Sequence, residues 1–115
     1  MNFNDNQAIY LQIVELMCEN ILLKKWPENE KIPSVRQLAM EVEVNPNTAM
    51  RTYTFLQEKE IIYNKRGIGF FVSENGYNKT LEFMKSKFIE HDVPLFLKML
   101  KLLNMELKDI ETHNT

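Results

Sequence analysis

The chain has little cysteine, no long apolar run and no excess of positive charge. Its single cysteine, Cys18, excludes an internal disulfide, and its place in an apolar stretch predicts a small buried side chain rather than a nucleophile or metal ligand. No segment approaches the roughly 20 consecutive apolar residues of a membrane span. The polar residues 2–6 lack the basic and then apolar order of a secretion signal. We therefore expect a cytoplasmic protein.

Signatures of catalysis and of metal binding are also missing. The sequence has no glycine-rich phosphate loop after a strand, no Ser-x-Gly nucleophile turn and no carboxylate pair in a catalytic context. The two histidines, His91 and His113, stand 22 residues apart without the cysteine or carboxylate neighbours that complete a metal site. We therefore predict neither an enzyme nor a metalloprotein, and we expect no cofactor.

What the chain does contain is typical of a folded domain. Hydrophobic residues make up 44% and charged residues 26% of its 115 residues, which suffices for one compact domain with a short helical appendage. The formal net charge of -2 does not favour binding to nucleic acid. Residues 24–72 nevertheless carry eight basic residues against six acidic ones, so any positive surface must lie in the middle third.

Two helices are predicted before residue 43. Over residues 7–25 apolar residues recur at helical spacing and form one broad stripe: Tyr10, Ile13, Val14, Met17 and Ile21. Pro27 opens a loop to Pro33 in which Ile32 is the apolar anchor. Ser34 followed three residues later by Gln37 forms a capping box, in which each side chain satisfies a backbone N–H at a helix start. This box predicts a short second helix, and its apolar face consists of Val35, Leu38, Ala39 and Val42.

A third helix is predicted to begin after Asn45, a good N-cap, with Pro46 at the first helical position, where an N–H has no partner anyway. At 100° per residue one side of this helix is apolar and carries Ala49, Tyr53 and Leu56. The opposite side is polar and carries Asn47, Arg51 and Thr54. Because Tyr53 falls on the apolar side, we predict a core residue there rather than a base-stacking one.

A β-hairpin and an apolar helical tail are predicted to follow. Residues 61–63 and 70–72 have the β-branched and aromatic composition of strands, and the glycine-containing residues 66–69 form the turn between them. Beyond Gly76, a break at Asp92 to Pro94 separates two amphipathic stripes. These stripes consist of Tyr77, Leu81, Met84 and Phe88, and of Phe96, Met99, Leu100, Leu103 and Leu107. The polar residues 111–115 are expected to fray.

This order of elements predicts a mostly α fold with a small β-hairpin. Residues 1–75 would form an N-terminal winged helix-turn-helix, and residues 76–115 a helical dimerisation segment. A major groove about 12 Å wide admits one α-helix, so the polar front of the third helix can meet base edges or phosphates. The start of the second helix would lie at the DNA backbone, and the hairpin tip would approach the minor groove. The predicted DNA-binding residues are Ser34, Arg36, Asn45, Asn47, Thr48, Arg51, Lys65, Arg66 and Gly67.

The sequence resembles the GntR family of bacterial regulators across residues 8–72. The matching stretches, in the right order and spacing, are Ile9–Ile13, Ile32–Ala39, Val44–Thr48, then Arg51, Tyr53 and Leu56, and finally Arg66–Val72. The resemblance implies sequence-specific binding of double-stranded DNA at an inverted repeat by a homodimer, usually a repressor released by an effector. With only 43 residues beyond residue 72, the chain resembles the YtrA-type branch, whose short two-helix tail serves for dimerisation.

Three positions depart from the family pattern. Asn29, Glu43 and Glu60 stand where the family often has glycine. Asparagine tolerates left-handed backbone angles fairly well and glutamate less readily, so residue preference at the two glutamates argues against a left-handed turn there.

Two amphipathic helices cannot bury both of their faces alone, so the tail predicts a dimer interface. Its expected residues are Leu81, Met84, Phe88, Phe96, Met99, Leu100 and Leu103. Other interpretations stay open at this point. The winged helix could serve as a protein-interaction module that does not touch DNA, and a small-molecule effector could sit between the tail helices of two subunits. Arg36 could pair with Glu41 or Glu43, and Lys65 and Arg66 could be solubilising charges on a turn.

Overall fold

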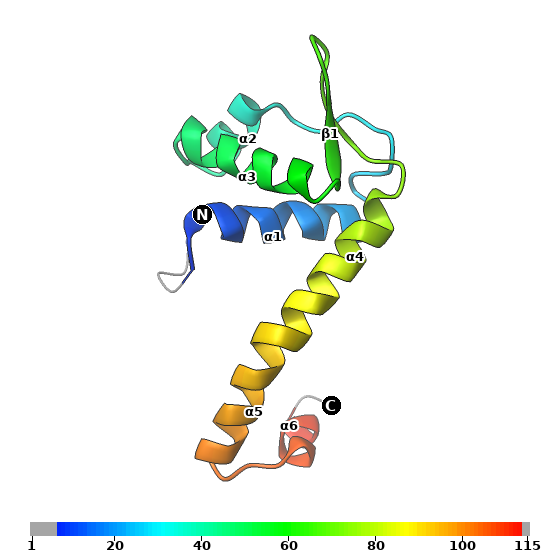
Figure 1. The fold of residues 1–115 in the computed structure, drawn as a ribbon. Helices are drawn as coiled ribbons and strands as arrows, with labels where there is room; N and C mark the ends of the chain where they lie inside the picture. Colours follow the sequence, from blue (N-terminus) through cyan, green and yellow to red (C-terminus); the bar gives the residue numbers. More distant parts are fainter. Residues whose placement is uncertain (1–6, 114–115) are drawn as a thin grey trace. The chain divides into compact units, whose positions relative to one another are not determined.

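The computed structural model describes residues 7–113, and the chain divides into two compact units, Met1–Glu82 and Phe83–Thr115 (Figure 1). The polar N-terminal residues 2–6 lie outside the described residues, as do the last two residues of the expected frayed end. Within residues 7–113, no helix combines the length and the apolar character needed to cross a bilayer.

Three helices form the body of the first unit: α1 (Ile9–Leu22), α2 (Val35–Glu41) and α3 (Pro46–Glu58). Both α1 and α2 pack on α3 (Figure 1). All three predicted helices are confirmed, although α1 is shorter at both ends than the predicted span of residues 7–25. The buried side chains that join the helices come from the predicted apolar faces, and Cys18 is fully buried among them. This core includes Ile13, Val14, Met17, Ile21, Leu38, Ala39, Ala49, Tyr53 and Leu56.

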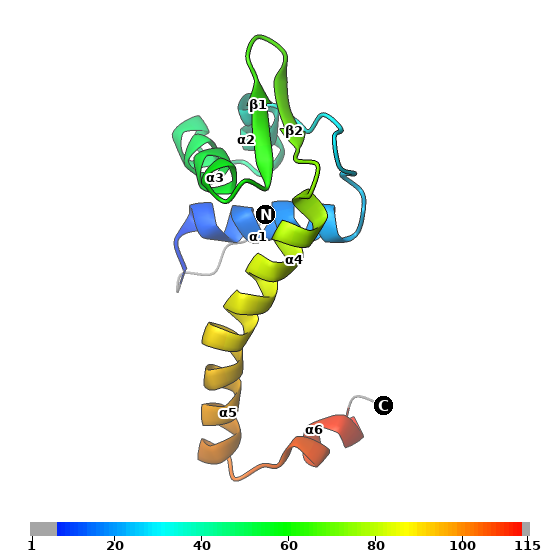
Figure 2. The same cartoon turned by 45° about the vertical axis from the view of Figure 1, so that its right-hand side comes forward.

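The hairpin consists of β1 (Ile62–Lys65) and β2 (Gly69–Val72), paired antiparallel from Ile62 opposite Val72 to Lys65 opposite Gly69 (Figure 2). The predicted loop before α2 lies along the other edge of β2. There the N–H of Ile32 donates to the carbonyl of Phe70 over 2.9 Å, and the N–H of Val72 donates to the carbonyl of Glu30 over 3.0 Å. Ile32 is buried, so the predicted anchor is confirmed, and the loop also supports the wing.

Four helices end in the same left-handed turn without a glycine. The residues in this turn are Lys24, Glu43, Glu60 and Asn104, with φ between 55° and 62°. In each case the N–H of the next residue donates to a carbonyl five positions earlier, as Val44 does to Ala39 over 2.9 Å, which is the bond that closes a Schellman motif. Glu43 and Glu60 occupy positions where the family that the sequence resembles often has glycine. Asn29, the third such position, also lies in the left-handed region, with a φ of 66°. The turn is therefore kept where the favoured residue is absent.

The tail differs from the prediction in its breaks. The expected break at Asp92 to Pro94 is wrong: α4 (Gly76–Lys87) continues through a π-helical segment, η1 (Phe88–Asp92), into α5 (Val93–Leu102). Pro94 cannot donate to a carbonyl four residues earlier, and it stands two residues after the π-helical segment η1, whose irregular hydrogen bonding accommodates a proline without ending the helix. The second stripe ends with α5, and a further short helix, α6 (Leu107–His113), follows where fraying was expected from residue 111.

Candidate nucleic-acid interface

The start of α2 carries two of the predicted DNA-binding residues. The Ser34 hydroxyl accepts a hydrogen bond from the N–H of Gln37 over 3.1 Å, and the Gln37 side chain accepts one from the N–H of Ser34 over 2.8 Å, so the capping box is confirmed. Ser34 and Arg36 are both exposed. Within residues 7–113, Arg36 forms no ion pair with Glu41 or Glu43, so its charge can reach an external anion.

The start of α3 is fixed by its cap. The side-chain oxygen of Asn45 accepts a hydrogen bond from the N–H of Asn47 over 2.8 Å, and Pro46 takes the first helical position as predicted. The Asn45 side chain therefore stabilises the start of α3. Asn47 is exposed and Thr48 half-buried, so the first turn of α3 presents polar side chains at the surface.

Tyr53 locks the back of α3 to its surroundings. Its side chain is fully buried, its hydroxyl donates to the carbonyl of Pro33, and its ring meets that of Phe70 edge-on with centroids 4.9 Å apart. Burial, with a smaller contribution from the Glu41 charge, raises the pKa of Tyr53 well above its usual range, so the hydroxyl stays protonated as a donor. The prediction of a core residue is confirmed, and one side chain ties α3 both to the start of α2 and to the wing.

Arg51 lies on the exposed side of α3 and stacks on a residue of α1. The Cζ atom of its guanidinium is 3.9 Å from the centroid of the Tyr10 ring. Tyr10 and Arg51 line a shallow hollow of about 360 Å³ together with Asn47 and Thr48. The structure thus brings three predicted interface residues together and adds Tyr10. The sequence pattern placed Tyr10 only on an apolar helical stripe, because spacing within α1 carries no information about the neighbouring helix.

The wing places its cations around β2. The Nζ atom of Lys65 is 4.6 Å from the centroid of the Phe71 ring, and Arg66 and Gly67 are exposed in the turn. Lys31, which sequence reasoning missed, crosses Gly69: a Cβ added at Gly69 would lie 2.9 Å from the Lys31 Cε atom. Lys31 reaches this position through the isolated bridge that it forms with Phe71, a long-range pairing that no local pattern reveals.

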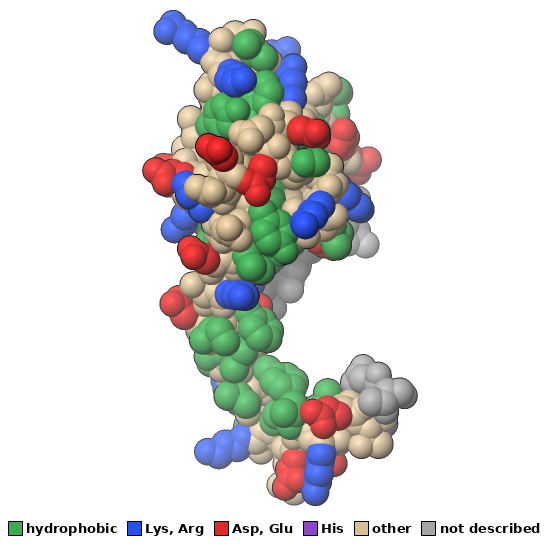
Figure 3. Space-filling model, turned by 90° about the vertical axis from the view of Figure 1, so that its right-hand side faces the viewer, with side chains coloured by type: hydrophobic (Ala, Val, Ile, Leu, Met, Phe, Trp, Pro, Cys, Tyr) green, Lys and Arg blue, Asp and Glu red, His purple; other side chains and the backbone are tan. Residues whose placement is uncertain are grey.

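The predicted dimerisation residues present a broad apolar surface. Phe88, Phe96, Met99 and Leu103 are between 39% and 59% exposed, and Leu81, Met84 and Leu100 are half-buried. No residue of η1, α5 or α6 is buried in the single chain. Figure 3 shows hydrophobic side chains gathered on the surface of this second unit. Leu107, the last residue of the predicted second stripe, is likewise exposed and lies in α6. Further exposed apolar residues that the sequence pattern did not single out are Ile89, Leu95, Leu97 and Leu102.

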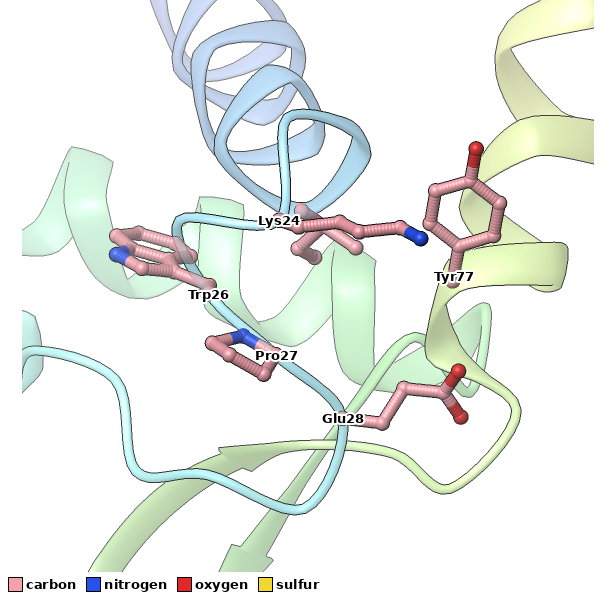
Figure 4. Close-up of a pocket in the computed structure, with 6 residues that line it drawn as sticks. Lys24, Trp26, Pro27, Glu28 and Tyr77 are labelled. Carbon is pink, nitrogen blue, oxygen red and sulfur yellow. The ribbon is translucent and has the colours of Figure 1, made fainter.

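A second hollow, of about 270 Å³, lies at the C-terminal end of α1 (Figure 4). The Lys24 ammonium stands 5.3 Å from the centroid of the Tyr77 ring, and Trp26 and Glu28 also line the hollow. Because α1 has 14 residues and rises 1.5 Å per residue, this hollow is about 20 Å from the Tyr10 end of the helix. It is therefore separate from the polar face of α3.

Cys18 has the chemistry of a buried core residue. Burial, with a smaller contribution from Glu15, raises the pKa of its thiol to about 12, so the reactive thiolate is not populated near neutral pH. In the part of the chain that the structure describes, no group of three or more His, Cys, Asp or Glu side chains is placed to hold a metal ion.

Comparison with known proteins agrees with this geometry. The family model described as bacterial regulatory proteins, gntR family, matches residues 9–72, more than half of the chain. The chain belongs to the GntR family. It is thus a DNA-binding transcriptional regulator with an N-terminal winged helix-turn-helix, as the sequence predicted.

Individual relatives support the same assignment. The chain is 31% identical to the uncharacterized HTH-type transcriptional regulator YhcF of Bacillus subtilis over 108 residues, which cover 94% of this chain and 88% of YhcF. It is 39% identical to the HTH-type transcriptional repressor YtrA of the same organism over 74 residues, 64% of this chain and 57% of YtrA. A GntR-family transcriptional regulator from Listeria monocytogenes has a similar structure, with a TM-score of 0.75 and 31% identity, covering 96% of this chain and 95% of the other. These relatives are named as regulators and not as enzymes.

Proposed function

We propose that this GntR-family regulator binds an inverted-repeat operator as a homodimer and represses transcription from it. The observation that carries the proposal is the two-sided character of α3. Its back, with Ala49, Tyr53 and Leu56, is fully buried, while Asn47 and Arg51 are exposed on the front. A helix held by its buried face can present the other face to the major groove in a fixed orientation.

Each group of interface residues has its own role in this proposal. Arg51 and Asn47 read base edges, because arginine pairs with guanine and asparagine with adenine in the major groove. Ser34 and Arg36 hold the DNA backbone at the start of α2 and set the register of the protein on the duplex. Lys65 and Arg66, joined by Lys31, meet the negative potential of the minor groove.

The homodimer is supported by the second unit. Nine large apolar side chains between residues 88 and 107 are 39% to 67% exposed, and η1, α5 and α6 have no buried residue. Exposed apolar surface of this extent marks an interaction site. A second copy of the same tail covers it and places two α3 helices against two half-sites, about one DNA turn apart.

Repression is supported by YtrA, which is named as a repressor and aligns with this chain over 74 residues. Control by a small-molecule effector stays a prediction.

The decisive experiment is selection of bound sequences from random duplex DNA by the full-length protein at near-physiological salt. We expect one inverted repeat. Arg51→Ala should lower operator affinity by about 1 to 3 kcal/mol and blur the preference at one position of each half-site. Arg36→Ala should weaken binding to all sequences alike, because a phosphate contact carries no base information. Lys24→Ala, at the far end of α1, is the matched control that removes a cation without touching the proposed interface.

Two outcomes contradict the proposal. A well-folded protein that selects no motif would favour the winged-helix interaction module instead. If the protein stays monomeric in sedimentation at micromolar concentration, both free and on selected DNA, the proposed homodimer is wrong. The proposed inverted-repeat operator, which depends on a dimer, is then wrong as well.

A further inference from the structure

Arg51, on the polar front of α3, contacts Tyr10 of α1 through its cationic group. Tyr10 stands in the first turn of α1, and the centroid of its half-buried ring is 3.9 Å from the Arg51 Cζ atom. The backbone beneath the ring is anchored independently, because the Thr52 hydroxyl donates to the Tyr10 carbonyl over 3.0 Å. A side-chain role of Tyr10 can therefore be separated from the attachment of α1 to α3.

Stacking on an aromatic ring leaves the reading edge of a guanidinium free. The flat face of the group contacts the ring, while its five N–H donors point outward in the plane. Within residues 7–113, no hydrogen bond or ion pair is formed by the Arg51 guanidinium, and the side chain is exposed. Its donors are thus presented to solvent in an orientation that the ring restricts.

We propose that Tyr10 is a positioning residue for operator recognition: its ring holds the Arg51 guanidinium in the orientation in which it reads a base, and so sets the strength of sequence preference. This inference rests on the proposed function, in which Arg51 contacts DNA. A free arginine at the surface must lose its rotational freedom when it binds, and a side chain already held in place loses less. The advantage exists only where a defined geometry is needed, at a base edge, and not in loose attraction to phosphates.

The contact between Tyr10 and Arg51 depends on the aromatic ring of Tyr10 and not on its hydroxyl. The Tyr10 hydroxyl takes no part in any hydrogen bond recorded among the described residues, so the face of the ring carries the effect. Phenylalanine should therefore replace tyrosine at this position, whereas an aliphatic side chain of similar size should not. Phe55, whose ring centroid is 6.2 Å from that of Tyr10, packs against the same ring but does not replace it under Arg51.

The test uses the full-length protein with Tyr10→Phe, Tyr10→Leu and Tyr10→Met, each alone and combined with Arg51→Ala. Affinity is measured for the selected operator, for every single-base variant of one half-site, and for unrelated duplex DNA at the same salt. Thermal unfolding of each variant shows whether it is folded, and two aliphatic replacements keep the test informative if one of them is not.

We expect Tyr10→Phe to bind as the wild type does. Tyr10→Leu and Tyr10→Met should lose about fivefold in operator affinity, keep their affinity for unrelated DNA, and lose discrimination at the position that Arg51→Ala blurs. In the Arg51→Ala background, the same replacements should change affinity less than about twofold, because residues that act through one contact are not additive.

Unchanged discrimination in folded Tyr10→Leu and Tyr10→Met would overturn the inference. An equal loss with and without Arg51 would overturn it too, since it would show that Tyr10 acts through the packing of α1. If the wild type selects no sequence at all, the proposed function fails, and that result is distinct from a wild type that selects an operator while the Tyr10 variants read it normally.

Discussion

The Tyr53 hydroxyl donates a hydrogen bond to the carbonyl of Pro33, the residue directly before the cap of α2. Tyr53 stands in the middle of α3, and its ring also packs edge-on against Phe70 of β2. One buried side chain therefore fixes three parts of the winged helix-turn-helix: the helix proposed to enter the major groove, the start of the helix proposed to grip the backbone, and the wing.

Replacing Tyr53 by phenylalanine tests this lock. The ring packing is retained, but the Pro33 carbonyl loses its donor in a partly buried place, so we expect a loss of about 1 to 2 kcal/mol in the free energy of unfolding. Urea unfolding at fixed protein concentration measures it. Tyr63→Phe is the control, because Tyr63 is half-exposed and stacks on Phe71. Equal stability of the Tyr53→Phe variant and the wild type would show that the hydroxyl does not hold the start of α2.

Glu43 offers a stabilising substitution. Its φ of 56° lies in the left-handed region, which costs a residue with a Cβ about 1 to 2 kcal/mol and glycine almost nothing. Glu43→Gly should therefore raise the free energy of unfolding by about 0.5 to 1 kcal/mol, after allowing for the greater freedom of glycine in the unfolded chain. Glu43→Ala removes the charge but keeps the Cβ and should change stability little. Thermal melts in which the glycine variant is no more stable than the alanine variant would contradict this account.

The sequence carried enough information for the local parts of this fold. The caps at Ser34 and Asn45 are signalled by neighbouring residues, so the starts of α2 and α3 were predicted to the residue. Contacts between distant segments were not predictable in this way. The stack of Arg51 on Tyr10 and the passage of Lys31 over Gly69 depend on how elements pack, which spacing within one segment does not encode.

The left-handed turns and the tail show where local residue preferences mislead a prediction from sequence. Glutamate at positions 43 and 60 argued locally against the turn, yet the bonds that close each Schellman motif outweigh the preference of a single residue. Pro94 predicts a break by its residue type, but the π-helical segment η1 directly before α5 lets the helix continue past it, and no local pattern signals such a segment.

Two features of the structure require glycine at position 69: its backbone conformation and the close approach of the Lys31 side chain. Its φ of 141° is rarely adopted by residues with a side chain, and a Cβ would lie 2.9 Å from the Lys31 Cε atom. Gly69→Ala should therefore cost about 1 to 3 kcal/mol of stability, mostly from the backbone, because the end of the lysine can move aside. In Gly67→Asn the added side chain meets open space at a φ of 81°, which asparagine tolerates, so the cost should be smaller. Urea unfolding that ranks the two variants in the opposite order would contradict the argument.

Lys31 is expected to add a phosphate contact to the wing. Lys31→Ala should weaken binding to specific and unrelated DNA by the same factor and reduce the slope of log affinity against log salt by about 1. The control is Lys24→Ala, since Lys24 lies over the Tyr77 ring at the other end of α1. A loss confined to the operator sequence would instead indicate that Lys31 reads a base, and no change in slope would remove it from the interface.

The first turns of α4 pack against the winged helix-turn-helix, so a stable fragment of this domain must include them. The predicted boundary at residue 75 precedes α4, but Thr80 is fully buried, Lys79 pairs with Glu60 over 3.1 Å, and the first compact unit extends to Glu82. A fragment of residues 1–82 should fold as a monomer that binds the operator weakly, because it lacks the apolar surface of η1, α5 and α6. A fragment of residues 1–75 should be less stable than residues 1–82 by about 2 kcal/mol, roughly the effect of exposing one well-buried side chain. Urea unfolding and sedimentation of the two fragments check both statements. Equal stability would place the end of the domain at residue 75, and a dimer of residues 1–82 would show that the tail is not the dimerisation element.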